Sequence, residues 1–590
     1  MVQVLWSAAL ALSGLSIARG ISAEIVSAQV PAAEEGSAKP AFTASSHHAR
    51  ENAAHIFNAV HSAMRQWGSS LRHNGLGLIP ATVPEGTLLY HGTRSNSTPK
   101  GFEWLAFEME HSEGFARSWK GGFGTPPPKK PGKGSGKGPG GEHPPPPPSS
   151  QHVVAVEDEQ RVLSGDNDDD GRGGSSFDDD GDGPRPMRGY FHTYRANRDL
   201  KLLYLDGMSA GKTAMGTLDT QDFLLRGVGN ASWFGEWERA AGVCEIVKAW
   251  GFDGVIRMEI GFESIYCDFF DGLDLVSALR RPWNTQFEGR GDIDMFEWAR
   301  AVGQRYDGIG GGRVKLDFSR MVSGLWYPLN VSNPNGRKDM PRLGRLKEEE
   351  REAIVGRVED VARQGGRGSK VDWQGLVDMI VTRHGDRIEA LADEPGDEDE
   401  AFVRQVLVVT NTFIDYPRDE FDSASVMGED GLVRESRERC VRHYLTPAKI
   451  WEDEWTPEEG LIFTAVETVV RRICGDLYAV RGIILDAAPE LAAAFSETEI
   501  RAAVGDADDG KIGEAVARGR KVVQALKSDL GWSMWKKCKP GCGVAEVCFV
   551  AMWPFGTEED HYHPSCKNRT SLGGRPAGKK SYWRFDSGFF

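Results

Sequence analysis

Apolar residues recur at helical spacing towards both ends of the chain. Between about residues 45 and 67 they fall every three or four positions, which predicts an amphipathic helix. A shorter run of this kind, with Ile354, Val358 and Val361, predicts a helix in the middle of the chain. The last third has two longer apolar stripes, so we expect it to be mainly helical. The stripes are Ile462, Val466, Val469, Ile473 and Leu477, and Ile512, Val516, Val523, Leu526 and Leu530.

Short apolar runs in the N-terminal half predict strands instead. They lie at residues 87–90, 104–107, 190–194, 202–205, 254–256 and 264–267, with a predicted helix at 233–250. This mixture predicts an α+β domain over residues 41–280. A mixed, partly loop-forming middle region over 281–430 follows, and then a helical, Cys-rich C-terminal domain over 431–590.

One stretch inside the predicted α+β domain has no such pattern. Residues 121–188 contain a polyproline and glycine segment followed by an acidic, glycine-rich segment. Chains of this composition lack the apolar residues that build a core. We therefore expect a disordered insert at 121–188.

The charge balance excludes some partners. The chain has 590 residues, with 70 Lys and Arg against 86 Asp and Glu, which gives a net charge of −16. This charge argues against binding to nucleic acid or to an anionic membrane surface. After the N-terminus no apolar run reaches the length of about 18 residues that a spanning helix needs, so we expect no membrane span there.

The N-terminus predicts export. An apolar block is followed by Ala18 and Gly20, which are placed as at a cleavage site, so residues 1–20 are predicted to be a signal peptide. A buried N-terminal helix is the alternative. Four sequons fit export and are candidate glycosylation sites, beginning at Asn96, Asn230, Asn330 and Asn568. The predicted location is therefore extracellular.

Eight cysteines, an even number, suit an oxidising compartment. Cys440 could pair with Cys474, and Cys244 with Cys267. The other four, which lie near His561 and His563, favour two disulfides over a zinc site because the chain is predicted to be secreted. They are Cys538, Cys542, Cys548 and Cys566. Sequence alone leaves the pairing open.

Three separated segments of the α+β domain carry candidate chemistry. They are residues 88–93 (LLYHGT), 189–194 (GYFHTY) and 251–256 (GFDGVI), the last leading to a strand with Glu263. In this order they resemble the ADP-ribosyltransferase-like superfamily in its His-Tyr-Glu variant, over about residues 84–280 without the insert. The resemblance implies a split β-sheet with helices and NAD as the substrate.

The resemblance also implies roles for single residues. Glu263 would be the catalytic carboxylate that stabilises positive charge on the ribose, with Glu259 as a competing candidate. His91 would be catalytic too and would donate a hydrogen bond that fixes the ribose. Gly92 and Thr93 would help to bind NAD, because glycine lets the backbone approach the dinucleotide. The aromatic ring that stacks on nicotinamide would be that of Tyr194 or Tyr190.

These features favour a secreted protein that transfers ADP-ribose from NAD to a protein or hydrolyses NAD. The alternative is a secreted, non-enzymatic binding protein on the same scaffold. A third class, a phosphate-loop NTPase, is suggested by residues 207–213 (GMSAGKT) and disfavoured because that loop is one residue too short. The acceptor, or partner protein, and the oligomeric state are left open by the sequence. No metal site is expected.

Overall fold

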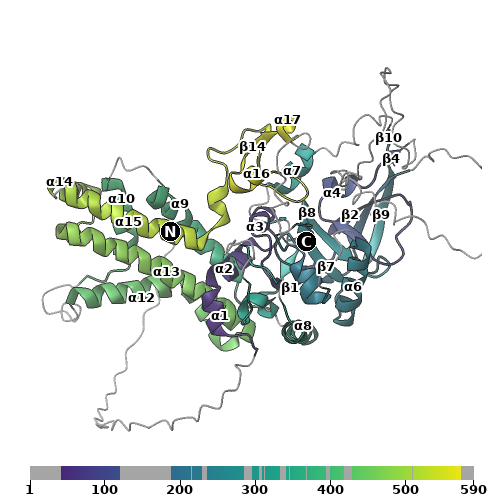
Figure 1. Cartoon of the computed structure of the whole chain (residues 1–590), viewed down its shortest axis with the longest axis horizontal. Coiled ribbons are helices and arrows are strands. Elements are labelled where there is room, and N and C mark those ends of the chain that lie inside the picture. Colours follow the sequence, from purple (N-terminus) through teal and green to yellow (C-terminus); the bar gives the residue numbers. More distant parts are fainter. Residues whose placement is uncertain are drawn as a thin grey trace, which may run out of the picture. The chain divides into compact units, whose positions relative to one another are not determined.

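A large mixed sheet forms most of the N-terminal half of this computed structural model (Figure 1). The structure describes residues 42–119, 188–213, 215–228, 235–284, 295–303, 308–310, 312–331, 340–343, 346–366, 368–393, 399–416, 428–507 and 509–572. The predicted signal peptide (1–20) and, apart from Arg188, the predicted insert (121–188) lie outside these residues.

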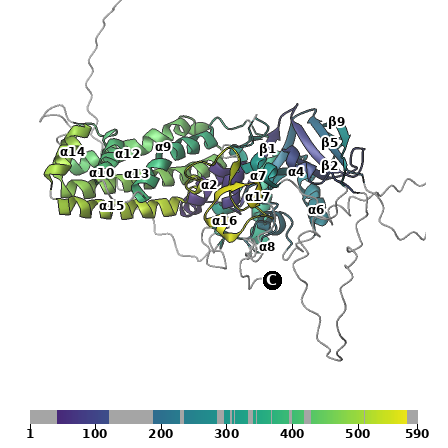
Figure 2. The same ribbon diagram turned by 90° about the horizontal axis from the view of Figure 1, so that it is seen from above.

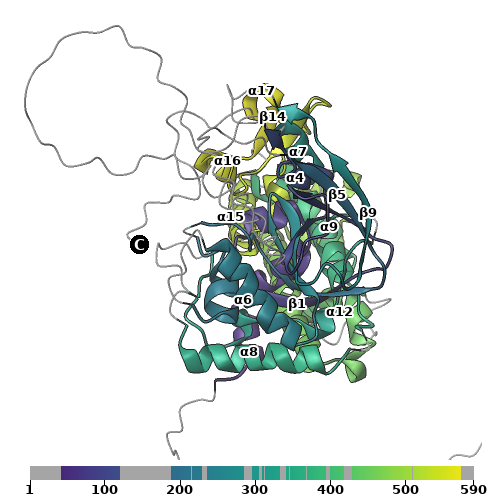
Figure 3. The same ribbon diagram turned by 90° about the vertical axis from the view of Figure 1, so that its right-hand side faces the viewer.

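The sheet has ten strands, nine of them in the order β11-β1-β6-β7-β8-β3-β2-β5-β9, while β12 also pairs with β1. Their bounds are β1 Gly77–Val83, β2 Leu88–Thr93, β3 Glu103–Ala106, β5 Tyr190–Ala196, β6 Leu200–Leu205, β7 Gly254–Glu259, β8 Gly261–Tyr266, β9 Leu273–Arg280, β11 Lys315–Leu316 and β12 Val322–Ser323. The pairs are antiparallel except β6 with β7. Figure 3 shows β5 and β9 side by side at one end of the sheet.

Burial explains why the central strands read as continuous apolar runs. Every residue of β8 is buried, and so are five of the six in β6 and in β7. Strands covered on both faces lose the polar alternation of a one-sided sheet. The end strand β9 keeps exposed positions, among them Leu275, Val276 and Leu279. Strands β1 and β9 were not predicted from the sequence, whereas the six predicted strands are all present.

Helices pack against this sheet at several places. Helix α6 (Glu236–Ala249) packs on β7 and β8, and the short α4 (Met109–Glu113) packs on β2 and β3. Helix α7 (Met295–Gly303) packs on α4, and α8 (Glu348–Arg363) lies against β12. The two short strands β4 (Ser118–Trp119) and β10 (Trp283–Asn284) form a separate parallel pair.

The C-terminal half is helical. Its long helices are α9 Trp373–Asp393, α10 Asp399–Asn411, α12 Gly428–Lys449, α13 Pro457–Ala487, α14 Glu497–Asp506 and α15 Asp509–Leu530. The prediction of helices is confirmed for the last third, whereas α9 and α10 lie in the region that was predicted to be mixed and partly loop-forming. Helix α13 is central, with α10, α12 and α15 packed on it (Figures 1 and 2). It begins at a capping box, in which the Thr456 side chain accepts from the Glu459 amide and the Glu459 side chain accepts from the Thr456 amide.

The N-terminal helical segment is broken into three pieces rather than one. They are α1 (Ser46–Glu51), α2 (Ala53–Ser62) and α3 (Gln66–Leu71). Asn52 leaves the helical conformation between α1 and α2, and Met64 has a positive φ of 56° before α3. Both α1 and α2 pack against α13, far along the chain. From Phe42 onward, the described residues therefore belong to one compact unit.

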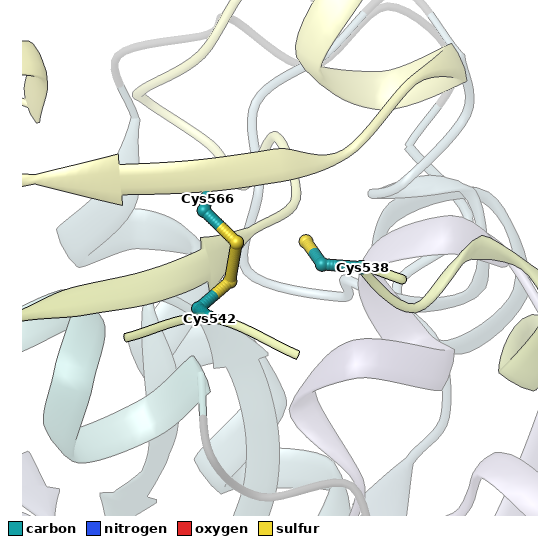
Figure 4. A group of neighbouring side chains, drawn as sticks. All are labelled: Cys538, Cys542 and Cys566. Atoms are coloured by element: carbon teal, nitrogen blue, oxygen red, sulfur yellow. A yellow bond between two sulfur atoms is a disulfide. The ribbon is translucent and has the colours of Figure 1, made fainter. Parts of the chain in front are cut away.

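Four disulfides join all eight cysteines. Cys244 pairs with Cys267 and Cys440 with Cys474, which confirms both predicted bonds. In the tail, Cys538 pairs with Cys548 and Cys542 with Cys566, next to the hairpin of β13 (Glu546–Phe549) and β14 (Ser565–Asn568). Figure 4 shows the Cys542–Cys566 bond with the Cys538 sulfur beside it. Sulfurs bonded in this way are no longer thiolates, the form in which cysteine binds zinc.

Within the part of the chain that the structure describes, no helix combines the length and apolar character that crossing a bilayer requires.

Candidate functional site

A pocket lies where strands β2 and β3 part from each other. The two strands share one registered pair, Tyr90 with Ala106. Beyond that pair the two backbones separate. Side chains from the separated parts of β2 and β3 line the pocket, together with side chains of β8 and α4. The lining residues are His91, Gly92, Thr93, Arg94, Glu103, Trp104, Ala106, His111, Ser112, Phe115 and Glu263.

The pocket is small. Its cavity volume is about 60 Å³, and it is partly open to solvent. A volume of that size holds several water molecules or one compact group of a ligand. A larger ligand would therefore place one end in the pocket and leave the rest outside.

His91 fills the place of a missing backbone hydrogen bond. Its Nδ1–H donates to the Trp104 carbonyl oxygen at 2.8 Å, across the point where β2 and β3 separate. A carbonyl can only accept, so Nδ1 carries the proton. Burial lowers the pKa of His91 to about 4, and repulsion by His192 adds to this effect. The ring is therefore neutral at pH 7. Its Nε2 is an acceptor and has no hydrogen-bond partner among the residues that the structure describes.

Glu263 is held by a charged partner on the neighbouring strand. The hairpin of β7 and β8 places Arg257 directly opposite Glu263, and the Arg257 Nε donates to Glu263 Oε1 at 2.8 Å. Glu263 is only 5% exposed. Burial raises the pKa of Glu263 against the pull of Arg257, and the neighbouring Glu259 raises it further. The second oxygen, Oε2, faces His111.

Behind Arg257 lies a fully buried group of charges centred on Glu236. Its carboxylate contacts Arg257, Arg239 at 2.7 Å and Lys212 at 3.3 Å. Burial raises the pKa of Glu236, but Arg257, Lys212 and Arg239 together hold it well below its usual range. Lys212, the lysine of the candidate phosphate loop, also lies 4.5 Å from the centre of the Trp553 ring. That lysine is thus engaged inside the protein.

Three potential metal ligands meet at one side of the pocket. His111 Nε2 lies 3.6 Å from Glu259 Oε1 and 3.6 Å from Glu263 Oε2. One ligand atom from each residue falls within 4.8 Å of the other two. A second such group, formed by His47, His48 and Glu51, lies at the surface.

The predicted site residues are only partly brought together. His91, Gly92, Thr93 and Glu263 line the same pocket, although they come from different strands. Tyr194 is completely buried, with its hydroxyl 3.1 Å from His192 Nδ1 and its ring edge-on to Phe269.

Neither Tyr190 nor Tyr194, the two tyrosines predicted to stack on nicotinamide, lines the pocket. Tyr190 sits at the start of β5, paired with Thr93 and with Arg280. Of the candidate sequons, Asn96, Asn330 and Asn568 are exposed, and Asn230 lies outside the described residues.

Sequence reasoning missed several residues of the pocket. Burial raises the pKa of Glu103 to about 8; this residue lies just before the predicted strand 104–107, which Trp104 opens. His111 belongs to the helix that follows, and Phe115 to the turn after that helix. Arg257 could have been found from the sequence, because a hairpin centred on Ile260 places residues 257 and 263 opposite each other. His111 had no comparable signal.

The residues on which the resemblance was based are each explained by a contact within this fold. A Cβ on Gly92 would lie 2.1 Å from the Ser112 carbonyl oxygen, so the protein's own backbone makes the close approach there. A Cβ on Gly254 would lie 2.1 Å from the Ile265 carbonyl oxygen. Glu263 pairs with Arg257. An antiparallel sheet of another family can require the same residues.

The comparisons with known proteins correct the family assignment. Residues 47–289 match the model of the YPL277C N-terminal domain. Two proteins of Saccharomyces cerevisiae (strain ATCC 204508 / S288c) are similar over much of their length. The uncharacterized protein YOR389W is 27% identical over 577 residues, covering 87% of this chain and 84% of that protein. The uncharacterized protein YPL277C is 29% identical over 423 residues, covering 62% and 80%.

No solved structure matches the chain. Since the matching family is that of the YPL277C N-terminal domain, the resemblance to the ADP-ribosyltransferase-like superfamily is wrong. The chain is similar, over its N-terminal half, to the YPL277C N-terminal domain and, over most of its length, to yeast YOR389W.

Proposed function

We propose that the pocket of His91 and Glu263 binds NAD and cleaves the bond between nicotinamide and ribose. ADP-ribose then passes to water or to a protein side chain. The observation that carries the proposal is that a neutral imidazole and a buried carboxylate, far apart in the sequence, line one pocket. The proposal depends on this geometry alone and not on membership of any transferase family.

The chemistry asks for a negative charge beside the ribose. When the bond from C1′ to the nicotinamide nitrogen breaks, its electron pair leaves with nicotinamide, which becomes neutral, and positive charge develops on the ribose. The Glu263 carboxylate, which is itself buried, would stabilise that charge. A water oxygen or acceptor atom then bonds to C1′ and releases a proton to solvent.

His91 would position the ribose as an acceptor. Its Nδ1–H is committed to the Trp104 carbonyl, so the free Nε2 can accept a hydrogen bond from a ribose hydroxyl. This reverses the direction expected from the sequence, in which His91 was the donor. Orientation of this kind lowers the entropic part of the barrier.

The nicotinamide ring would pack on an aromatic side chain that lines the pocket. Trp104 and Phe115 are in that position, and buried Tyr194 is not. The pocket has room for the ribose or the nicotinamide ring, so the adenosine half of NAD would extend over the surface. Stacking on an aromatic face requires no exact polar match.

Release of nicotinamide from NAD by the purified chain tests the proposal. We expect turnover by the wild type, and a fall of at least about 100-fold in Glu263→Gln, because one preorganised electrostatic group is typically worth this much. His91→Ala should raise KM more than it lowers kcat. Glu490→Gln, at an exposed position remote in sequence, is the matched control and should behave as the wild type.

Loss of activity in Glu263→Gln could also reflect misfolding, since Arg257 loses a partner. Melting temperatures with and without NAD separate the two causes, because a ligand at 100 times its Kd adds about 2.7 kcal/mol. Wild type that neither turns over NAD nor is stabilised by it would overturn the proposal. Stabilisation without turnover would favour the non-enzymatic binding protein instead.

The chain is also proposed to be secreted. Four disulfides support this, since structural disulfides are rare in reducing compartments. Three of the four sequons have an exposed asparagine. A eukaryotic host expressing the full chain should release it into the medium, with a mobility that increases after enzymatic removal of N-glycans. Retention of unmodified protein inside the cells would contradict the prediction.

A further inference from the structure

A buried histidine faces two carboxylates at one wall of the pocket. His111 lies on α4, Glu259 ends β7 and Glu263 lies on β8. The His111 Nε2 is 3.6 Å from an oxygen of each carboxylate, which is too long for a hydrogen bond. Ligand atoms at about 2.0–2.1 Å from a tetrahedral zinc ion lie about 3.4 Å from one another. The spacing therefore suits an ion between the three groups better than direct hydrogen bonds.

His111 also lacks the hydrogen bonds that a buried imidazole normally has. It is 2% exposed, and Nδ1 has no hydrogen-bond partner in the part of the chain that the structure describes. Among the described residues, Nε2 has the two carboxylate contacts at 3.6 Å and no shorter polar contact. Trp298 packs against the ring at 5.3 Å and holds it in this orientation. A buried imidazole whose Nε2 has only polar contacts beyond hydrogen-bond distance is uncommon, and this indicates an absent partner between Nε2 and the two carboxylates.

The charge of this wall supports the same conclusion. Glu259 and Glu263 would repel each other, and Arg257 compensates Glu263 through the other oxygen, Oε1. Oε2 of Glu263 and the carboxylate of Glu259 remain turned towards His111. A carboxylate held by an outer hydrogen-bond donor on one oxygen is the usual arrangement of a metal ligand.

We infer that His111, Glu259 and Glu263 form a binding site for a divalent transition-metal ion, with Zn²⁺ as the best match to one imidazole and two carboxylates. Three protein ligands leave one coordination position open, and His111 and Glu263 both line the pocket. An open position is the mark of sites that bind water or a ligand, whereas structural zinc sites are closed. The inference shares Glu263 with the proposed NAD site but does not require NAD chemistry.

Zinc binding to the full, disulfide-bonded chain tests the inference. After removal of metal with a chelator, calorimetric titration with Zn²⁺ should show tight binding of one ion at this site. We expect His111→Gln and Glu259→Gln to weaken it by more than about 100-fold, since loss of an outer partner alone costs 10–100-fold. Co²⁺ in the same site should give visible absorption bands that these variants lose.

Two controls make the result specific. His48→Gln removes a histidine from the exposed group of His47, His48 and Glu51, and should leave the tight site intact. His91→Ala disturbs the proposed NAD site without removing a metal ligand, so it should retain zinc. Failure of NAD turnover with zinc binding intact would thus overturn the proposed function alone. Absence of tight binding in the wild type, or unchanged affinity in folded His111→Gln, would overturn the metal site.

Discussion

At the scale of single residues, burial sets the protonation of several side chains. Asp206, at the end of β6, is almost fully buried and accepts a hydrogen bond from the Gly77 amide at 2.9 Å. Burial raises the pKa of Asp206 to about 7 from an ordinary value of 3.8. The folded chain therefore keeps this proton at pH values where the unfolded chain has lost it.

This difference predicts a pH-dependent effect of Asp206→Asn. Below the unfolded pKa both states are protonated and ionisation costs nothing. As the pH rises from the unfolded to the folded pKa, the wild type alone loses stability. The loss is about 4 kcal/mol, because the two pKa values differ by about 3. The free energy of unfolding of Asp206→Asn, relative to wild type, should thus increase by this amount between about pH 4 and pH 8.

Urea unfolding at a series of pH values measures the effect. The exposed Asp486→Asn is the control and should track the wild type at every pH. A constant offset between Asp206→Asn and wild type would mean that Asp206 ionises normally in the folded chain.

At the scale of elements, the pocket exists because β2 and β3 separate after a single registered pair. Helix α4 covers the opening, and its backbone comes so close to β2 that only glycine fits at position 92. His91 then supplies, from a side chain, the hydrogen bond that the separated strands no longer make. The same few residues that form the pocket thus also stabilise its walls.

Two glycine-to-alanine substitutions test this packing. Gly92→Ala places a Cβ 2.1 Å from the Ser112 oxygen, where backbone must move, so we expect a loss of about 1–3 kcal/mol. Gly356→Ala, in the middle of α8, meets no atom within 4 Å and should stabilise the chain by about 0.5–1 kcal/mol. Thermal unfolding of both variants shows whether each substitution lowers or raises the stability as expected. A neutral Gly92→Ala would show that α4 does not press on β2.

At the scale of the whole molecule, disulfides join segments that are close in the sequence, and polar contacts join segments that are far apart. Each disulfide joins residues at most 34 positions apart, so the bonds staple neighbouring elements. The long-range links include hydrogen bonds and an ion pair of the N-terminal helical segment. Asn58 donates to the Leu530 carbonyl at 2.8 Å, and Arg65 binds the Asp378 carboxylate through two nitrogens. These contacts attach the N-terminal helices to the C-terminal ones.

Removing the disulfide of longest separation should therefore weaken the entire unit. Replacing Cys440 and Cys474 together by Ala frees a loop of 34 residues, for which chain entropy predicts a loss of about 4 kcal/mol. Denaturant unfolding should show a lower midpoint and a somewhat steeper slope, because the unfolded chain without this cross-link exposes more surface. The doubly substituted tail pair Cys538 and Cys548, separated by 10 residues, should lose less, about 3 kcal/mol. Equal or reversed losses would argue against the entropic explanation.

The sequence by itself determined the features that depend on neighbouring residues. Apolar spacing located the six strands and the helices α6, α8, α13 and α15, because side-chain direction repeats every 2.0 or 3.6 residues. Helices α9 and α10 were not predicted. The bonds Cys244–Cys267 and Cys440–Cys474 could be predicted since each joins adjacent elements. The extra strands β1 and β9 were missed.

The tertiary structure alone decided which side chains meet. Tyr194 and His91 lie on neighbouring strands, yet Tyr194 is enclosed in the core and His91 reaches the pocket. His111 came from a segment with no chemical motif, and folding brought it to Glu259 and Glu263. Strand periodicity states that residues alternate between two faces, but not which face is covered or which strand lies beside it. Those choices are made by packing between segments that are distant in the chain.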